Sequence, residues 1–224
     1  MEPMAQRDQP PSSEPDMRGG SRTNAVVADK RLLRGARTRQ AIARHGVDVA
    51  SLEGLDGLSL GRLAADLGLS KSGIQALFGT RENLQLAVVA SAHEQFLDAV
   101  VRPALREPHG VARLRALLER WIVYAETPLF AGGCFWSANL TEFDSRPGPV
   151  RDALLRQHRE WRALLAGELR RAIDAGEIAD ADVDLVAFQI DAVLAAANVA
   201  LRLGDAAVVD KVRRVIDGFL GPAS

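Results

Sequence analysis

The sequence predicts an all-α fold, and three observations support that prediction. From about residue 30 onward, apolar residues recur at the three- and four-residue spacing of amphipathic helices. No stretch shows the sustained alternation of apolar and polar residues that a β-sheet requires. Glycine and proline divide the rest into segments of helical length. With 224 residues, 47% of them apolar, the chain is long enough for one or two domains with real cores.

Composition excludes several classes of protein. The single cysteine, Cys134, cannot form an intrachain disulfide or a multi-cysteine zinc site. The N-terminus lacks the apolar core of a signal peptide. The most apolar segment, 185–203, carries four polar or charged residues that would be costly inside a bilayer. We therefore expect a cytoplasmic protein without a membrane partner.

The N-terminal elements follow from local chemistry. Residues 1–28 are rich in proline, glycine and charge and poor in large apolar residues, which is typical of a disordered tail. A long helix is expected over about 33–53, and two short helices follow Ser59 and Ser70. These elements form the first predicted domain, residues 29–80.

The remaining helices form the second predicted domain, residues 81–224. One helix follows Thr80 and runs to about Pro103, and the next opens after Pro108 and ends before Pro128. Pro149 suits the first position of a helix of about 26 residues that ends at Gly176. Shorter helices are expected over about 133–143, 182–203 and 206–219.

The short helices after Ser59 and Ser70 are joined by a glycine turn at Gly68, which is the arrangement of a helix-turn-helix. We expect Leu69, Ile74 and Leu77 to hold the second helix against the first. Its other face would present Lys71, Ser72 and Gln75. A cation suits a phosphate, and a hydroxyl and an amide can bond base edges, so this face fits a DNA major groove.

The charge distribution is compatible with that interpretation. Residues 22–90 carry a net charge of +4, although the whole chain has −1. A basic segment in a neutral protein favours an anionic partner, but an ordinary charged surface or helical hairpin has the same features. Arg81 opens the next helix beside the second short helix, where a phosphate could be held.

Three segments in fixed register resemble the DNA-binding domain of the tetracycline-repressor-like (TetR) family of transcriptional regulators. They are Arg37-Thr-Arg-Gln-Ala-Ile42, Leu58-Ser-Leu-Gly-Arg-Leu-Ala-Ala-Asp-Leu-Gly-Leu-Ser-Lys-Ser-Gly-Ile74 and Leu77-Phe-Gly-Thr-Arg-Glu-Asn-Leu84. The resemblance implies an all-α homodimer. A three-helix N-terminal domain would bind double-stranded DNA at a palindromic operator, and a variable C-terminal helical domain would bind a small-molecule effector and dimerise.

The resemblance also implies roles for single residues. Together with the helix chemistry above, it gives eight candidate DNA-binding residues: Thr38, Ser59, Arg62, Ser70, Lys71, Ser72, Gln75 and Arg81. The family usually has a tyrosine where this chain has Gln75, so the phosphate contact of that tyrosine is replaced here. Gln75 could read adenine instead.

Aromatic residues gather between residues 121 and 161, which suits an apolar ligand cavity, although aromatics also fill ordinary cores. The candidate effector-pocket residues are Trp121, Tyr124, Phe130, Cys134, Phe135, Trp136, Asn139, Phe143 and Trp161. Cys134 could sense redox state if exposed, but a lone cysteine among aromatics is usually a small buried hydrophobe.

The segment 184–203 is apolar nearly all round, so a second subunit is expected to cover it. The candidate dimer-interface residues are Val193, Ala196, Ala197, Ala200, Val208, Val212 and Val215. Two recognition helices about one DNA turn apart would combine weak half-site contacts into useful affinity.

No histidine pair, nucleophile motif or phosphate-binding glycine loop is present, so we expect no catalytic residue, metal or cofactor. The favoured hypothesis is a ligand-responsive regulator, with repression as the expected mode. The alternative is a helical small-molecule-binding or enzymatic protein whose helix-turn-helix no longer functions.

Overall fold

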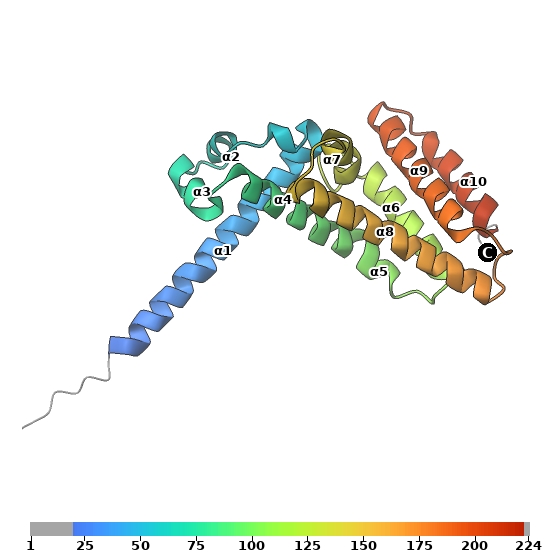
Figure 1. The fold of residues 1–224 in the computed structure, drawn as a ribbon, viewed down its shortest axis with the longest axis horizontal. Helices are drawn as coiled ribbons and strands as arrows, with labels where there is room; N and C mark the ends of the chain where they lie inside the picture. Colours follow the sequence, from blue (N-terminus) through green and yellow to red (C-terminus); the bar gives the residue numbers. More distant parts are fainter. Residues whose placement is uncertain (1–19, 222–224) are drawn as a thin grey trace, which may run out of the picture. The chain divides into compact units, whose positions relative to one another are not determined.

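The computed structural model describes the backbone of residues 20–221 and the side chains of residues 33–221. Over these residues the chain is helical, without strands, as predicted (Figure 1). The helices are α1 (Gly20–Glu53), η1 (Leu55–Gly57), α2 (Leu60–Asp66), α3 (Lys71–Phe78), α4 (Arg81–Phe96), η2 (Leu97–Val101), α5 (Arg102–Ala104), α6 (Val111–Glu126), α7 (Phe135–Phe143), α8 (Pro149–Asp174), α9 (Val183–Arg202) and α10 (Val208–Leu220).

The chain divides after Thr38 into two units, and the boundary falls within α1. The predicted tail lies outside the described residues as far as residue 19. Its last part, residues 20–28, forms the beginning of α1 instead of a tail. From Ser21 to Arg34 the sequence has neither glycine nor proline, so nothing in it interrupts the helix.

Hydroxyl side chains begin the short helices. Ser59 Oγ accepts a hydrogen bond from the Arg62 N–H, and Ser70 Oγ accepts one from the Gly73 N–H, both at 3.1 Å. Each bond satisfies one of the free N–H groups at a helix start. Between α2 and α3, Gly68 adopts a φ of 63°, which glycine tolerates best. Sequence chemistry therefore determines both helices of the motif.

The second unit has a continuous apolar core. Helix α8 packs against α4, α6, α7 and α9, and α9 packs in turn against α10 (Figure 1). Fully buried side chains from several of these helices meet there, among them Leu84, Leu114, Phe135 and Leu165. Burial of this apolar surface is the main stabilising contribution to the fold.

The helix predicted from Thr80 to Pro103 is present, but its last turns are not regular. After α4 the chain winds through the π-helical turn η2 and then the short α5. Pro103 has no N–H to donate to the carbonyl four residues earlier, and its ring crowds that carbonyl. A wider turn before the proline accommodates it, and such turns are frequent at functional sites.

Helix α9 is long and apolar enough to cross a membrane by length and composition alone. One such helix is weak evidence, because core helices pass the same criterion. Here α9 packs between α8 and α10 and contributes Ile190 and Leu194 to the core.

Candidate functional site

Helix α3 has one buried face and one exposed face. Ile74 and Phe78 are buried, whereas Lys71, Ser72 and Gln75 are exposed. Leu69, which we expected to hold the two short helices together, is 41% exposed. The contacts come instead from buried Leu63 and Ala64 on α2, which share the core with Ile74. The exposed face therefore carries the polar groups expected of a recognition helix.

Lys71 is the basic side chain of that face. Among the described residues, no carboxylate lies within ion-pair distance of Lys71, so its charge is available to a ligand. Ser72 Oγ lies 3.4 Å from Ser70 Oγ, at the start of the same helix. The Gln75 amide donates one hydrogen bond to the Gly79 carbonyl, which leaves its second N–H and its Oε1 without this partner.

Two other candidates have charged partners within the chain. The Arg62 guanidinium pairs with both carboxylate oxygens of Glu53 and lies 3.7 Å from Asp66. The hydrogen bond to Glu53 raises the pKa of Arg62, and the same bond lowers the pKa of Glu53. Arg62, a candidate DNA-binding residue, is therefore ion-paired within the chain.

Arg81 stabilises the start of α4. Its Nε donates to the Leu58 carbonyl at 3.0 Å, and its Nη2 binds the carbonyl and carboxylate of Asp56. The helix cap is provided by Thr80, whose Oγ1 accepts from the Asn83 N–H. Arg81 therefore fastens α4 to η1, and half of its side chain remains exposed.

Arg39 is a residue that sequence reasoning missed. Its guanidinium donates to the Leu77 carbonyl and lies over the Phe78 ring, 4.6 Å from the ring centroid. It thereby joins the second unit's part of α1 to the end of α3. Thr38 belongs to the first unit, where its hydroxyl donates to the Arg34 carbonyl at 2.9 Å.

A cavity of about 760 Å³ lies among α4, η2, α6, α7, α8 and α9. Four aromatic residues contribute to its wall: Phe96, Trp121, Trp136 and Trp161. The Phe96 ring stands edge-on to those of Trp136 and Trp161, with centroids 5.1 and 5.4 Å away. This geometry is favourable for aromatic pairs and makes a rigid apolar wall.

Polar groups occupy part of the same wall. His93 Nε2 lies 3.7 Å from a carboxylate oxygen of Glu160, and His158 Nε2 lies 3.2 Å from one of Asp191. Burial lowers the pKa of His93, because desolvation opposes its charged form more than Glu160 favours it. Gln157 also lines the cavity.

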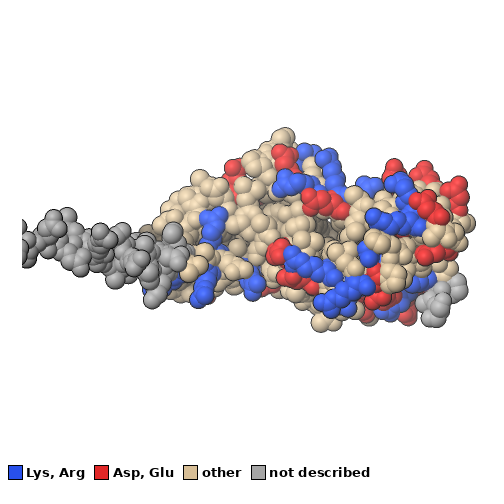
Figure 2. Space-filling view, turned by 90° about the horizontal axis from the view of Figure 1, so that it is seen from below, with Lys and Arg blue, Asp and Glu red and all other residues tan. Residues whose placement is uncertain are grey.

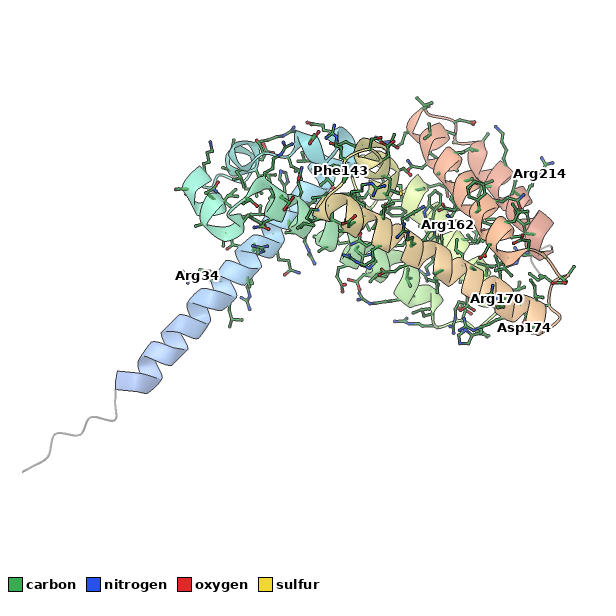
Figure 3. All side chains as sticks on the ribbon, in the orientation of Figure 1. Arg34, Phe143, Arg162, Arg170, Asp174 and Arg214 are labelled. Atoms are coloured by element: carbon green, nitrogen blue, oxygen red, sulfur yellow. The ribbon has the colours of Figure 1, made fainter. Side chains whose placement is uncertain are left out.

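Helix α7 separates the cavity from the helix-turn-helix. One face lines the cavity with Trp136, Ser137, Leu140 and Thr141. On its other side, Asn139 Oδ1 and Glu142 Oε2 both accept from the Leu55 N–H at 2.8 Å. Phe143 marks the C-terminal end of α7 in Figure 3.

The loop before α7 also reaches the end of α1. The Gly132 N–H donates to Ser51 Oγ at 2.8 Å, and a Cβ at position 132 would lie only 1.9 Å from the Ser51 carbonyl oxygen. Only glycine permits this approach. Movement of α7 would therefore displace the end of α1 and η1, which it contacts.

Comparison with known proteins agrees with this geometry. Residues 110–216 match the model of the tetracyclin repressor-like C-terminal domain. The fold is similar to that of a TetR transcriptional regulator from Chloroflexus aurantiacus J-10-FL, with 26% identity, a TM-score of 0.72 and coverage of 83% of this chain and 94% of that chain. The chain belongs to the TetR family. No curated protein matches it in sequence.

Two further TetR-like structures extend the comparison. A TetR-family regulator from Agrobacterium tumefaciens has a TM-score of 0.72 at 17% identity, covering 83% of this chain and 99% of that chain. AibR, solved with isovaleryl coenzyme A and operator DNA, has a TM-score of 0.65 at 18% identity, with the same coverage of both chains. The fold is thus that of TetR-family regulators.

The cavity of this TetR regulator contains some, but not all, of the predicted pocket residues. Trp121, Cys134, Trp136 and Trp161 line it, and Cys134 is buried. The other five lie off its wall: Tyr124, Phe130, Phe135, Asn139 and Phe143. They are buried because they pack in the core or hold the backbone, as when Tyr124 Oη accepts from the Phe135 N–H.

The predicted dimer-interface residues differ in their exposure. Ala196 and Val215 are exposed, and Val193, Ala200 and Val208 are half-buried. Ala197 and Val212 are each only 2% exposed because they face the chain's own core. Outside the candidate interface residues, but within the apolar segment that we expected a second subunit to cover, an exposed apolar stripe runs along α9 and ends at its C-cap: Leu185, Phe188, Val199 and Leu203.

The sequence contained signals for the missed TetR cavity residues. His93, Phe96 and Leu97 recur at three- and four-residue spacing at the end of α4, and Gln157, Glu160 and Trp161 do so on α8. Such spacing places residues on one helix face. Phe96 was missed because the search for clustered aromatic residues covered residues 121–161, whereas Phe96 lies earlier in the chain, on α4.

Proposed function

We propose that this TetR-family chain is a ligand-responsive transcriptional regulator, with repression as its mode and a palindromic operator as its DNA site. The observation that supports this function best is that a single helix, α4, reaches both candidate sites. Helix α4 begins one turn after recognition helix α3 and ends in the wall of the 760 Å³ cavity. One rigid element therefore connects the two candidate sites.

On the DNA side, Lys71 would bind a phosphate, and Ser72 and Gln75 would contact base edges. Ser59 and Ser70 use their side chains as helix caps, so their contribution to DNA binding would come through the helix starts that they hold in place. Arg62 and Arg81, each paired within the chain, would position α2 and α4 instead of acting as free cations.

On the ligand side, the effector would act by favouring one orientation of α4. It must bind the two conformations with different affinities, because a ligand with equal affinity shifts nothing. Helix α7 would provide a second route, since Asn139 and Glu142 hold the Leu55 N–H while Trp136 and Leu140 line the cavity. A change in the distance between the two α3 helices of a dimer would then release the operator.

A homodimer would complete the DNA-binding unit. The stripe on α9 leaves Leu185 and Phe188 at least 50% exposed, and apolar area of this kind is favourable to cover. A two-fold axis at α9 would place two copies of α3 on successive half-sites. We propose a cytoplasmic location, no membrane partner and no enzymatic activity.

The paired state of Arg62 and Gln75 is what favours the alternative, a ligand-binding protein with an inactive helix-turn-helix. A gel-shift assay separates the two functions. Purified full-length protein is titrated onto the DNA flanking its own gene and onto DNA of shuffled sequence, at two salt concentrations with competitor DNA. A competitor-resistant complex on the flanking DNA, with two chains per site, supports the regulator. Equal, competitor-sensitive binding to both DNAs would favour the alternative.

A further inference from the structure

We propose that the cavity takes a cationic, largely apolar ligand, such as an aryl or alkyl ammonium compound. This inference rests on the proposed ligand-binding function and specifies its chemistry. It follows from the aromatic residues that line the cavity, from the carboxylates in its wall, and from the absence of lysine and arginine among its lining residues.

Aromatic rings form much of the wall. Phe96, Trp121, Trp136 and Trp161 come from four different helices and meet at this one cavity. The face of such a ring carries negative electrostatic potential and attracts an ammonium group, and tryptophan does so most strongly. Several rings around one space therefore suit a cation with apolar substituents.

The charged side chains of the wall have one sign. Glu160 and Asp191 line the cavity, and no lysine or arginine is among its lining residues. The two histidines each lie beside one of these carboxylates, and burial lowers the pKa of His93, which favours its neutral form. The site therefore has negative charge that a bound cation can neutralise.

Arginines outside the cavity do not change this balance. Arg102, which acts on His93 from a distance, is paired with Glu94 and Asp98. Arg156 also acts on His93, but it lines a separate surface depression together with Arg151, Arg159, Asp152 and Glu160. Arg162 turns toward α9, where its guanidinium lies over the Phe188 ring at 5.7 Å (Figure 3).

Three buried polar atoms on lining residues give an independent indication of a binding site. His93 Nδ1, Trp136 Nε1 and Gln157 Oε1 have no hydrogen-bond partner, and Trp136 and Gln157 are each only 8% exposed. Leaving such groups unpaired is unfavourable. A wall built only for stability would avoid this cost, whereas an ammonium ligand that carries an N–H group could donate to Gln157 Oε1.

An anionic ligand fits this wall poorly. Its charge would be repelled mainly by Asp191, whose side chain is 20% exposed, because the Glu160 side chain is 55% exposed and better screened by water. Neither carboxylate has an arginine or lysine partner among the described residues that could reverse this. The cavity is thus expected to discriminate by charge as well as by size.

The test uses three ligands that share a benzyl group but differ in charge: benzyltrimethylammonium, its neutral carbon isostere neopentylbenzene, and the anion phenylacetate. All three tryptophans of the chain line the cavity, so intrinsic fluorescence reports its occupancy directly. The full-length protein is titrated without DNA. We expect the dissociation constant of the cation to be about tenfold lower than that of the isostere, with phenylacetate weakest.

Variants assign the effect to the carboxylates. Glu160→Gln with Asp191→Asn should weaken binding of the cation about tenfold and leave binding of the isostere unchanged. Asp174→Asn, at the far end of α8 and away from the cavity wall, is the matched control. Figure 3 shows Asp174 near the C-terminal end of α8.

The proposal is overturned if the isostere or phenylacetate binds as tightly as the cation, if the cation does not bind, or if the double variant retains full affinity for it. If the protein bound the ligand but did not bind operator DNA, the gel-shift assay would show it and these titrations, which contain no DNA, would not. Failure of the ligand class and failure of the regulator function are therefore distinguishable.

Discussion

At the scale of single residues, buried Glu168 organises the side of the bundle where α8 meets the start of α6. Its side chain is 1% exposed, and it accepts hydrogen bonds from the Gly110 N–H at 3.0 Å and from Arg171 at 2.7 Å, with His109 Nδ1 3.1 Å away. Burial alone would raise the pKa of Glu168, but these donors outweigh it and lower the pKa.

Glu168→Gln should therefore destabilise the fold at neutral pH by about 2 kcal/mol, because charge-assisted hydrogen bonds are replaced by neutral ones. A carboxyl group with a lowered folded-state pKa stabilises the protein above its unfolded pKa, and this contribution is lost as the pH falls through the folded value. The difference between variant and wild type should thus shrink below pH about 4. Urea unfolding at several pH values measures it, and a constant difference would contradict the account.

Residue types were easier to predict than residue roles. Ser59, Ser70 and Thr80 were recognisable as caps because capping depends on local sequence. The pairing of Arg62 with Glu53 was not, because it joins two helices whose relative placement depends on the fold. Arg81 was placed correctly at the start of α4, but its hydrogen bond to the Leu58 carbonyl also required the tertiary structure.

At the scale of elements, α7 links the cavity wall to the helix-turn-helix. Glu142 accepts from the N–H groups of Leu55 and Asp56, both at 2.8 Å, and Asn139 adds a bond to the Ala50 carbonyl. These contacts fix η1, on which Arg81 and hence α4 depend.

Glu142→Gln should loosen this link, because one carboxylate oxygen is replaced by an amide that cannot accept. We expect the amides of Leu55 and Asp56 to exchange hydrogen about tenfold faster, with protection in α9 and α10 unchanged. Hydrogen exchange of the full chain measures this. Glu126→Gln, at the exposed end of α6, is the matched control. Unchanged exchange at both Leu55 and Asp56 would show that Glu142 does not hold η1.

Most helix boundaries followed from glycine, proline and capping residues, and the whole of α8 was predicted to within a few residues. The early start of α1 was missed because the composition of residues 20–28 resembles a tail, although residues 21–34 contain neither glycine nor proline. The π-helical turn at η2 was missed because periodicity identifies a helix without specifying its winding. The cavity required tertiary structure, since its wall combines residues from six elements.

At the scale of the molecule, the surface agrees with separate sites for different partners. Figure 2 shows basic and acidic side chains intermixed at the end that holds the C-terminal helices. That mixed surface does not favour DNA. The exposed apolar stripe on α9 favours a second copy of the chain instead.

Phe188→Asp should therefore convert a dimer into monomers, because a charge would be buried at the interface. Monomers lose the joint binding of two half-sites, so operator affinity should fall by about a hundredfold. Analytical ultracentrifugation and gel shifts measure both effects. Val123→Asp, at an equally exposed position on α6, is the control. A dimer that persists in Phe188→Asp would place the interface elsewhere.

The exposed face of α3 is the proposed DNA-binding surface, and the salt dependence of DNA binding by Lys71→Ala tests this assignment. Lys211→Ala is the matched control, since Lys211 lies on α10 and pairs with Asp205. Fluorescence anisotropy with operator DNA at several salt concentrations should show weaker binding for Lys71→Ala, with the slope of log affinity against log salt reduced by about one unit per chain. Lys211→Ala should match wild type. Equal affinity and equal slope for Lys71→Ala and wild type would contradict the assignment of α3 as the DNA-binding helix.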